Sequence, residues 1–273
     1  MDAIIIRPLT EMKEFRDCHQ LQAIAWNLKD MEEVVPDHQL LTAQKNGGLV
    51  LGAYLDQEMI GFSYGFVGLN LQKQVIFCSH LLAVLPQYRG LSIGYSLKLA
   101  QREEILKKGI SIITWTFDPL ETANAKLNLK KLGGVANTYY INHYGSLDGI
   151  NKDLPSDRLV IEWHINSERV RSIIQGNDIE MPREIYKPLE LLPAEDGTEP
   201  LMKEFEEKET ILLEVPTQIQ KIKKDNSSLA LRWRFALREA MCNYFAKGYY
   251  VDNLLNMSDD SVSYVLKKGG VLS

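Results

Sequence analysis

The sequence predicts an α/β fold with a mixed sheet of the α+β type. Strand patterns and helix patterns alternate through the first 166 residues. Two predicted helices directly follow long strands, which favours parallel pairing there. The 273 residues are 45% hydrophobic and 25% charged, an ordinary globular composition. This length fits one large domain with an extension.

Short β-branched or alternating stretches predict strands at residues 3–7, 49–55, 59–69, 75–84, 110–117, 135–144 and 159–165. Apolar residues at helical spacing predict a first helix that Thr10 caps and that continues to residue 28. Further helices are predicted at residues 37–46, 93–108 and 122–132, each followed by glycine. Residues 1–168 are therefore predicted to form one domain.

The composition changes after about residue 170. Four prolines lie within nineteen residues, at Pro182, Pro188, Pro193 and Pro200. Residues 169–210 are therefore predicted to connect two parts of the chain. Residues 211–273 follow as a smaller β-α-β extension, with strands at 211–215 and 249–255 and a helix at 229–246. We expect this extension to cover the acceptor side of a site or to mediate dimerisation.

Charge and cysteine content disfavour several classes of protein. The net charge is −5 with a pI of about 5.6, whereas proteins that bind nucleic acid or anionic membranes are usually basic. Cys18, Cys78 and Cys242 lie far apart, which predicts neither a disulfide framework nor a paired metal site. With no signal-peptide pattern and no long apolar run, we expect a cytoplasmic protein.

The residues from Leu82 to Gly94 carry the most specific signal. A strand ends, a loop with small residues follows, and a helix begins at Ile93. The first turn of a helix offers unpaired N–H groups and a positive dipole end, which suit an anion. The patterns of Walker loops and dinucleotide-binding loops are absent. The alternative is an ordinary junction with turn glycines.

The order of residues in this loop resembles the acyl-CoA loop of the GNAT acyltransferase superfamily. Gln87, Gly90 and Ser92 stand at the positions of the [QR]-x-x-G-x-[GA] motif, with Ser92 where Gly or Ala is usual. The element order of residues 1–166 is also similar to the GNAT order. Other stretches resemble a bacterial GNAT branch with a C-terminal extension, namely residues 79–82, 115–120, 124–129, 157–159, 232–234 and 248–249.

The resemblance implies that the protein binds acetyl-CoA or another acyl-CoA as co-substrate. Backbone N–H groups of residues 89–95 would hold the pyrophosphate, and the backbone of Leu82 and Val84 would pair with the pantetheine arm. Asn124 matches a position that often contacts the cofactor. The implied cofactor-binding residues are Leu82, Ala83, Val84, Gln87, Tyr88, Arg89, Gly90, Leu91, Ser92, Ile93, Gly94, Tyr95, Asn124 and Asn128. Since the extension lacks such a loop, we expect that it does not bind CoA.

His80 is the predicted general base. Transfer to an amine needs the amine neutral, and a histidine with a pKa near 6.5 suits removal of its proton. Strand alternation would place His80 on the face of Cys78, Leu82 and Val84. The alternative is a half-buried structural histidine.

The sequence offers only weak candidates for a general acid that would protonate the CoA thiolate. Many GNAT enzymes have a tyrosine that protonates the CoA thiolate, and Leu129 stands at that position here. A thiolate can leave unprotonated, or Tyr144, Tyr140 or Asn128 could reach the sulfur. Asp118 follows a buried strand and could bind an ammonium or orient His80, the alternative being a turn or N-cap residue.

Four arginines remain ambiguous. Arg158 could bind a carboxylate of the acceptor or the acyl group, or it could form an ordinary surface pair with Asp157. Arg232, Arg234 and Arg238 lie mostly off the apolar face of their helix, which favours a solvated or ion-paired surface over a substrate contact.

These observations predict an acyl-CoA-dependent N-acyltransferase. The amine of a small molecule would attack the thioester directly in a ternary complex, without a metal. The alternatives are an inactive acyl-CoA-binding sensor, or transfer of a larger acyl group such as succinyl to an amino acid. We expect no nucleic-acid or membrane partner. The sequence leaves open whether the protein forms a homodimer.

Overall fold

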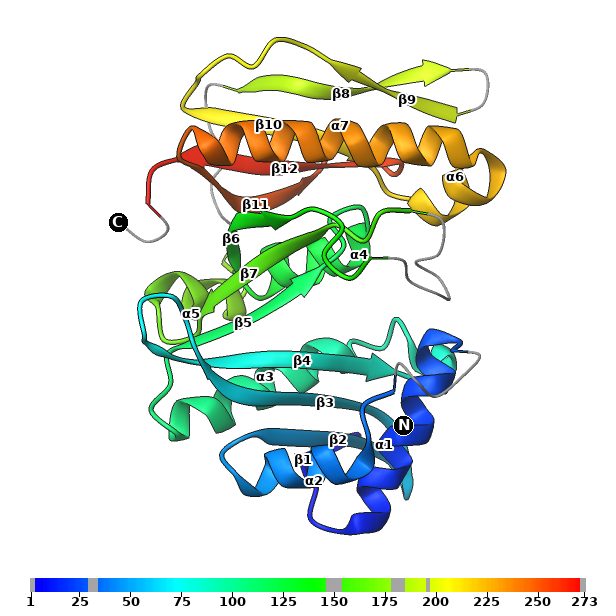
Figure 1. The fold of residues 1–273 in the computed structure, drawn as a ribbon, viewed down its shortest axis with the longest axis vertical. Coiled ribbons are helices and arrows are strands. Elements are labelled where there is room, and N and C mark those ends of the chain that lie inside the picture. Colours follow the sequence, from blue (N-terminus) through cyan, green and yellow to red (C-terminus); the bar gives the residue numbers. More distant parts are fainter. Residues whose placement is uncertain (1–2, 29–33, 146–153, 178–184, 195–196, 271–273) are drawn as a thin grey trace. The chain divides into compact units, whose positions relative to one another are not determined.

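The computed structural model describes residues 3–28, 34–145, 154–177, 185–194 and 197–270 (Figure 1). They fall into two compact units. The first unit runs to Trp115 and includes a short return of the chain at His164–Asn166, and the second contains the other described residues. The predicted α/β class is confirmed, because each unit combines helices with strands.

The first unit contains β1 (Ile5–Pro8), α1 (Met12–Trp26), α2 (Asp37–Lys45), β2 (Leu49–Leu55), β3 (Glu58–Leu69), β4 (Val75–Val84), the 3-10 turn η1 (Pro86–Tyr88), α3 (Ile93–Lys107) and most of β5 (Ile112–Phe117). Strands β1 to β4 pair in order as antiparallel neighbours, and β5 runs parallel to β4. The N-cap of α1 is Glu11 rather than the predicted Thr10. The Glu14 carboxylate accepts the N–H of Glu11 at 2.9 Å, which fixes that start.

Helices pack on both faces of this sheet. Phe15 of α1 and Leu40 of α2 belong to one buried cluster with Phe62 and Tyr64 of β3. On the other face, the buried Lys98 of α3 donates to Ser79 of β4. The two faces follow from the alternation of side chains along the strands.

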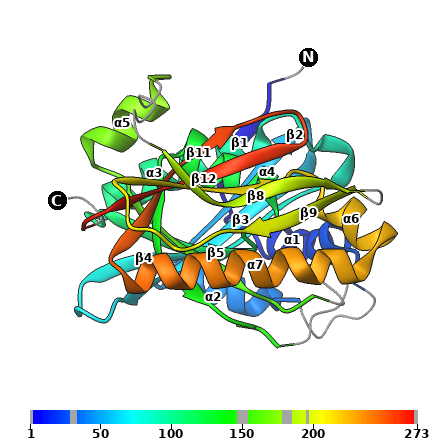
Figure 2. The same ribbon diagram turned by 90° about the horizontal axis from the view of Figure 1, so that it is seen from above.

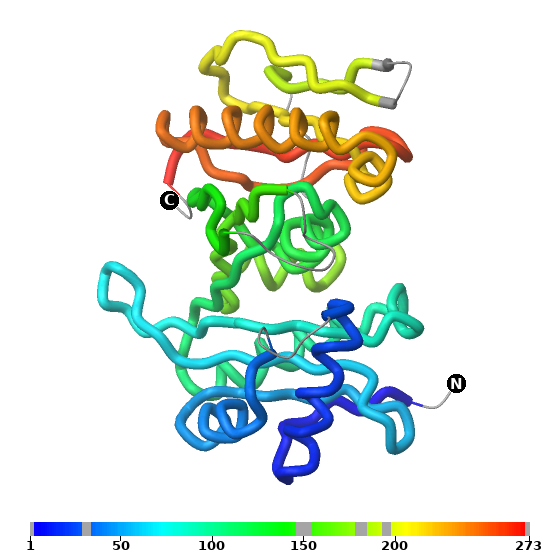
Figure 3. Tube along the Cα trace, turned by 45° about the vertical axis from the view of Figure 1, so that its right-hand side comes forward, coloured from blue at the N-terminus to red at the C-terminus, as the bar shows by residue number. Residues whose placement is uncertain are grey.

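The second unit contains α4 (Thr122–Ala125), the π-helical turn η2 (Lys126–Lys131), β6 (Val135–Tyr140), most of β7 (Arg158–His164), α5 (Glu168–Ile174), β8 (Tyr186–Ala194), β9 (Gly197–Met202), β10 (Thr210–Pro216), α6 (Ile219–Asp225), α7 (Ser227–Ala246), β11 (Tyr249–Asn256) and β12 (Ser261–Lys268). Its strands are ordered β7-β6-β11-β12-β10-β8-β9. Helix α7 lies along one face of these strands (Figures 2 and 3). Its Trp233, Leu237 and Tyr244 are fully buried.

The predicted connecting segment is more regular than its prolines suggested. Residues 169–210 include α5, β8 and β9. Pro188 lies where the pairing of β8 with β10 shifts register, and Pro200 lies in the edge strand β9. Both positions tolerate a missing N–H. Pro182 lies outside the described residues. The division between residues 1–168 and the extension stays a prediction.

The predicted β-α-β pattern of the C-terminal part was incomplete. It missed strand β12, which pairs antiparallel with both β11 and β10. The alternating apolar residues Val262, Tyr264 and Leu266 indicate this strand in the sequence. The turn before it contains no glycine that would have marked its start. The predicted strand 135–144 also ends early, because β6 stops at Tyr140 and a turn follows.

Candidate functional site

The loop between β4 and α3 has the backbone of an anion site. Gly90 and Ser92 both adopt left-handed conformations, with φ of 84° and 60°. No side chain caps the N-terminus of α3 at Ile93, so its first N–H groups stay available. A Cβ at Gly90 would meet no atom within 4 Å, which leaves open space beside the loop.

The side chains of Tyr88 and Arg89 hold this loop in place. The Tyr88 hydroxyl donates to Glu58 at 2.9 Å. Arg89 donates through Nη2 to the Ala25 carbonyl of α1 at 2.5 Å and through Nε to the Val84 carbonyl at 3.4 Å. Both side chains are therefore committed to protein partners, which leaves their backbone for the predicted ligand contact.

At the end of β4, the backbone N–H and C=O groups on the side away from β3 are a candidate ligand-binding edge. Leu82, Ala83 and Val84 pair with β3. On the β5 side, pairs join Phe77 to Ile113 and Cys78 to Thr114. Among the described residues of the first unit, this pairing does not continue past Cys78. Leu82 and Val84 thus have no second strand partner in their own unit.

His80 lies at a β-bulge, which corrects its predicted orientation. Tyr64 pairs with Leu81 and Gly65 with Ser79, so His80 has no partner on β3. The extra residue reverses the alternation beyond it. The His80 ring meets Tyr64 edge-on at 5.8 Å and lies 6.1 Å from Phe66.

The His80 side chain therefore lies on the same face of β4 as Cys78, but not on the face of Leu82 and Val84. Tyr64 and Phe66 are on the face of Cys78, whereas Leu82 and Val84 lie opposite Ser63 and Gly61 on the other face. Part of the His80 surface is exposed, yet burial of the imidazole lowers the pKa of His80 below its usual value of 6.5. A neutral imidazole at pH 7 can accept a proton.

The predicted acid and amide positions lie in the second unit. Asn124 is exposed and Asn128 is buried. Leu129, at the place of the usual tyrosine, is completely buried. Tyr144 lies in the turn after β6, where it is 48% exposed and its hydroxyl is 3.2 Å from the hydroxyl of Thr116.

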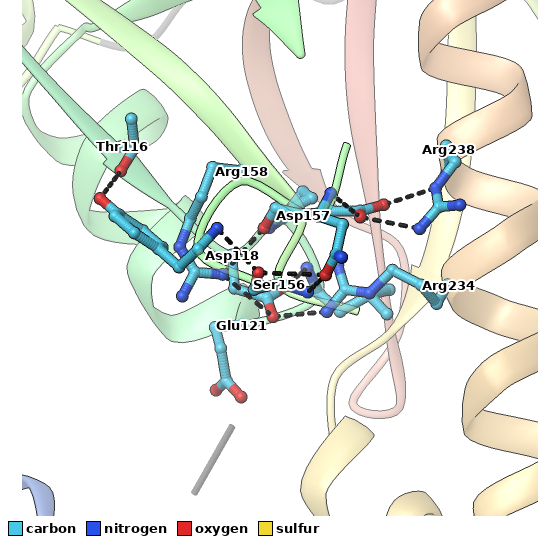
Figure 4. Close-up of polar contacts among 12 residues, drawn as sticks. Thr116, Asp118, Glu121, Ser156, Asp157, Arg158, Arg234 and Arg238 are labelled. Carbon is cyan, nitrogen blue, oxygen red and sulfur yellow. Dashed lines mark hydrogen bonds and ion pairs between the residues drawn. The ribbon is translucent and has the colours of Figure 1, made fainter. Parts of the chain in front are cut away.

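Asp118 takes part in a network of buried charges in the second unit (Figure 4). Its Oδ2 pairs with Nη2 of Arg234 at 2.5 Å and lies 3.8 Å from Nη1 of Arg158. The Asp157 carboxylate accepts two hydrogen bonds from Arg238, each 2.8 Å long. Burial by itself raises the pKa of Asp157, but the hydrogen bonds from Arg238 hold that pKa below its usual value.

This network corrects two predictions. Arg234 is ion-paired, as one of the two predicted alternatives has it, but it is fully buried rather than on a surface. Asp157 and Arg158 are buried rather than a surface pair. Asp118 does not cap a helix, since Glu121 is the N-cap of α4. Its Oδ1 instead accepts the N–H of Leu120 at 2.8 Å and closes a turn.

Lys98 is a further residue that the sequence analysis missed. It is buried on α3, where Nζ donates to Ser79 at 2.7 Å and lies 3.6 Å from the centre of the Trp115 ring. Burial lowers the pKa of Lys98 well below its usual value. The helical spacing with the buried Gln101 and Ile105 was the available signal.

Solved acetyltransferase structures resemble this chain. The ribosomal-protein-S18-alanine N-acetyltransferase from Escherichia coli is 18% identical over 60% of this chain and 96% of its own, with a TM-score of 0.48. An acetyltransferase of the GNAT family from Streptococcus pneumoniae is 14% identical over 59% of this chain and 98% of its own, also with a TM-score of 0.48.

A third similar structure is the PaiA N-acetyltransferase from Thermoplasma acidophilum in complex with coenzyme A. It is 19% identical over 59% of this chain and 99% of its own, with a TM-score of 0.44. No protein-family model matches the sequence. No curated protein matches it either.

The described residues show neither a membrane-spanning helix nor a metal-ligand cluster. None of their helices is long and apolar enough to cross a membrane. They include no group of three or more His, Cys, Asp or Glu residues placed to hold a metal ion.

Proposed function

We propose that this protein is an acyl-CoA-dependent N-acyltransferase that transfers an acetyl group to the amine of a small molecule. The observation that supports this most is the loop from Leu85 to Ser92. It combines two left-handed residues, open space beside Gly90 and an uncapped helix N-terminus. These features suit a pyrophosphate, and the loop's Gln87, Gly90 and Ser92 match the acyl-CoA motif.

The binding part of the proposal uses mainly backbone groups. N–H groups of residues 89–95 would hold the pyrophosphate of acyl-CoA, and the backbone of Leu82 and Val84 would pair with the pantetheine arm. Acyl-CoA supplies the thioester that makes the acyl group transferable. Asn124 and Asn128 are proposed as side-chain contacts to the same co-substrate.

In the proposed reaction, the amine nitrogen attacks the thioester carbonyl carbon. The C–N bond forms, the C–S bond breaks, and the thiolate leaves. His80 accepts the proton that the amine loses, since its lowered pKa keeps the imidazole neutral at pH 7. Tyr144 and Asp118 remain proposed catalytic residues, Tyr144 as a proton donor and Asp118 as a partner for the ammonium or for His80.

We expect the His80→Gln variant to lose activity while it still binds CoA. The loss of a general base should lower kcat by about 10²- to 10⁴-fold. Because the base acts in its neutral form, wild-type kcat should be constant above pH 7 and fall as the pH drops below 6.5. This fall should be absent in the variant.

Steady-state kinetics across this pH range, with CoA binding measured by calorimetry, test the role of His80. His38→Gln is the matched control, because His38 is exposed on α2 and should leave kcat unchanged. Full kcat in His80→Gln would rule out the general base.

A second candidate is an acyl-CoA-binding sensor without catalysis. The buried Leu129 favours it, since a leucine cannot protonate the thiolate at the usual acid position. Thiol release from acetyl-CoA and succinyl-CoA with a panel of amines and amino acids decides between the two, together with thermal shift by CoA. Thiol release that depends on the acceptor indicates the enzyme, and a thermal shift without turnover indicates the sensor.

A further inference from the structure

The buried charges around Asp118 do not balance. Within the described residues, Arg158, Arg234 and Arg238 have ion pairs with two carboxylates, those of Asp118 and Asp157. Asp157 is occupied by Arg238. In this part of the structure, Arg158 and Arg234 therefore share the Asp118 carboxylate.

Glu121 is a further carboxyl group close enough to interact with Asp118 and Arg234. It accepts a hydrogen bond from Gln220, and Figure 4 shows its carboxyl group directed away from Asp118. Burial raises the pKa of Glu121. Its hydrogen bond is with Gln220, and no ion pair joins it to Arg158 within the described residues.

The two guanidinium groups beside Asp118 also have unused donors. Nε and Nη1 of Arg234 are buried and have no hydrogen-bond partner among the described residues. Arg158 donates a hydrogen bond from Nη1 to the Asp157 carbonyl at 2.9 Å. Unmet buried donors are costly. Nε and Nη2 of Arg158 make no hydrogen bond to the residues that the structure describes, so they can donate to a further acceptor.

The backbone around Arg158 is held firmly by the turn that follows β6. Ser156 donates to the Gly145 carbonyl at 2.8 Å and accepts the N–H of Tyr144 at 2.9 Å. Asp157 accepts the N–H of Asn142 at 2.9 Å. A side chain on so constrained a backbone is preorganised for binding.

The small exposed part of the Arg158 side chain lies beside the Tyr144 ring. Its guanidinium lies 5.1 Å from the centre of the Tyr144 ring, and Tyr144 contacts Thr116 through the two hydroxyls. The Arg158 side chain is 9% exposed, and Tyr144 beside it is 48% exposed. The exposed edge of Arg158 is thus next to the more exposed Tyr144, which is the side from which a ligand would approach.

We propose that Arg158, with Tyr144 and Thr116 beside it, binds the carboxylate of a reactant. A guanidinium with two free donors can bind a carboxylate through two parallel hydrogen bonds. The inference rests on the proposed acyltransferase function for the identity of the ligand. The carboxylate would belong either to the acceptor amine or to the acyl group, and the experiment separates these sources.

The test uses the full chain and two pairs of probes. The first pair is an L-amino acid panel and the corresponding amino-acid amides, which have the same amine but no carboxylate. The second pair is succinyl-CoA and acetyl-CoA. Binding is measured by calorimetry, and turnover by thiol release.

For one pair, we expect the probe with the carboxylate to bind about 10- to 100-fold more tightly. Arg158→Gln should remove this difference, and Arg158→Lys should restore it only in part, because lysine cannot form the paired hydrogen bonds. Arg232→Gln is the matched control, since Arg232 is an exposed arginine paired with Glu199 on the same unit. Thermal melts confirm that each variant is folded.

Two outcomes would overturn the proposal. One is that neither pair shows a preference for the carboxylate, and the other is that the preference survives in Arg158→Gln. The proposed function fails separately, if CoA itself does not bind. Tight binding of amino acids through Arg158 without any CoA binding would keep the carboxylate site and remove the acyltransferase.

Discussion

Replacement of Gly90 by valine should abolish CoA binding while the protein stays folded. Gly90 has a φ of 84°, and a Cβ there would meet no protein atom within 4 Å. The left-handed backbone costs a non-glycine residue about 1–2 kcal/mol, which a domain of this size tolerates. The valine side chain would instead fill the open space that the pyrophosphate needs, so we expect at least a 100-fold loss of affinity by calorimetry.

Gly109 provides the matched control for this variant. It follows the other end of α3, has a φ of 73°, and also has open space where a Cβ would stand. Gly109→Val should therefore have a similar backbone cost but bind CoA normally. Equal affinity of the two variants for CoA would show that the loop at Gly90 is not the binding site.

The sequence could predict the loop between β4 and α3, because its conformation depends on residues that are close together in the chain. The loop after β4 follows from the positions of Gly90 and Ser92 and the start of a helix at Ile93, all within a few residues. The structure gives both loop residues the left-handed backbone that such a loop needs. Short-range patterns therefore predicted the strand, loop and helix of this stretch, whereas its role in binding CoA stays a proposal.

Features that depend on distant partners could not be predicted. The bulge at His80 arises from its pairing with β3, and one inserted residue was enough to change the predicted face. Arg234 was predicted to be on a solvated or ion-paired surface, because helical spacing alone places it beside the apolar stripe. Its partner Asp118 is 116 positions earlier in the chain, and no local pattern connects the two.

The pair between Asp118 and Arg234 should dominate the stability of the second unit. Arg234 is completely buried and has its ion pair with Asp118, which raises the pKa of the Arg234 guanidinium although burial opposes the charge. Removing one member of a buried pair leaves the other charge uncompensated, at a cost of about 3–5 kcal/mol. We therefore expect Asp118→Asn to lower the free energy of unfolding by that amount in denaturant titrations.

The double variant Asp118→Asn/Arg234→Met distinguishes an uncompensated charge from a lost contact. Methionine removes the buried charge and keeps much of the side-chain volume, so the double variant should regain most of the lost stability. Glu199→Gln is the control, because it breaks the exposed pair of Arg232 on the same helix and should cost less than about 1 kcal/mol. If Asp118→Asn costs no more than this control, Arg234 does not depend on Asp118. If the double variant is less stable than Asp118→Asn, the cost does not come from an uncompensated charge, and the polar contacts of Arg234 themselves stabilise the unit.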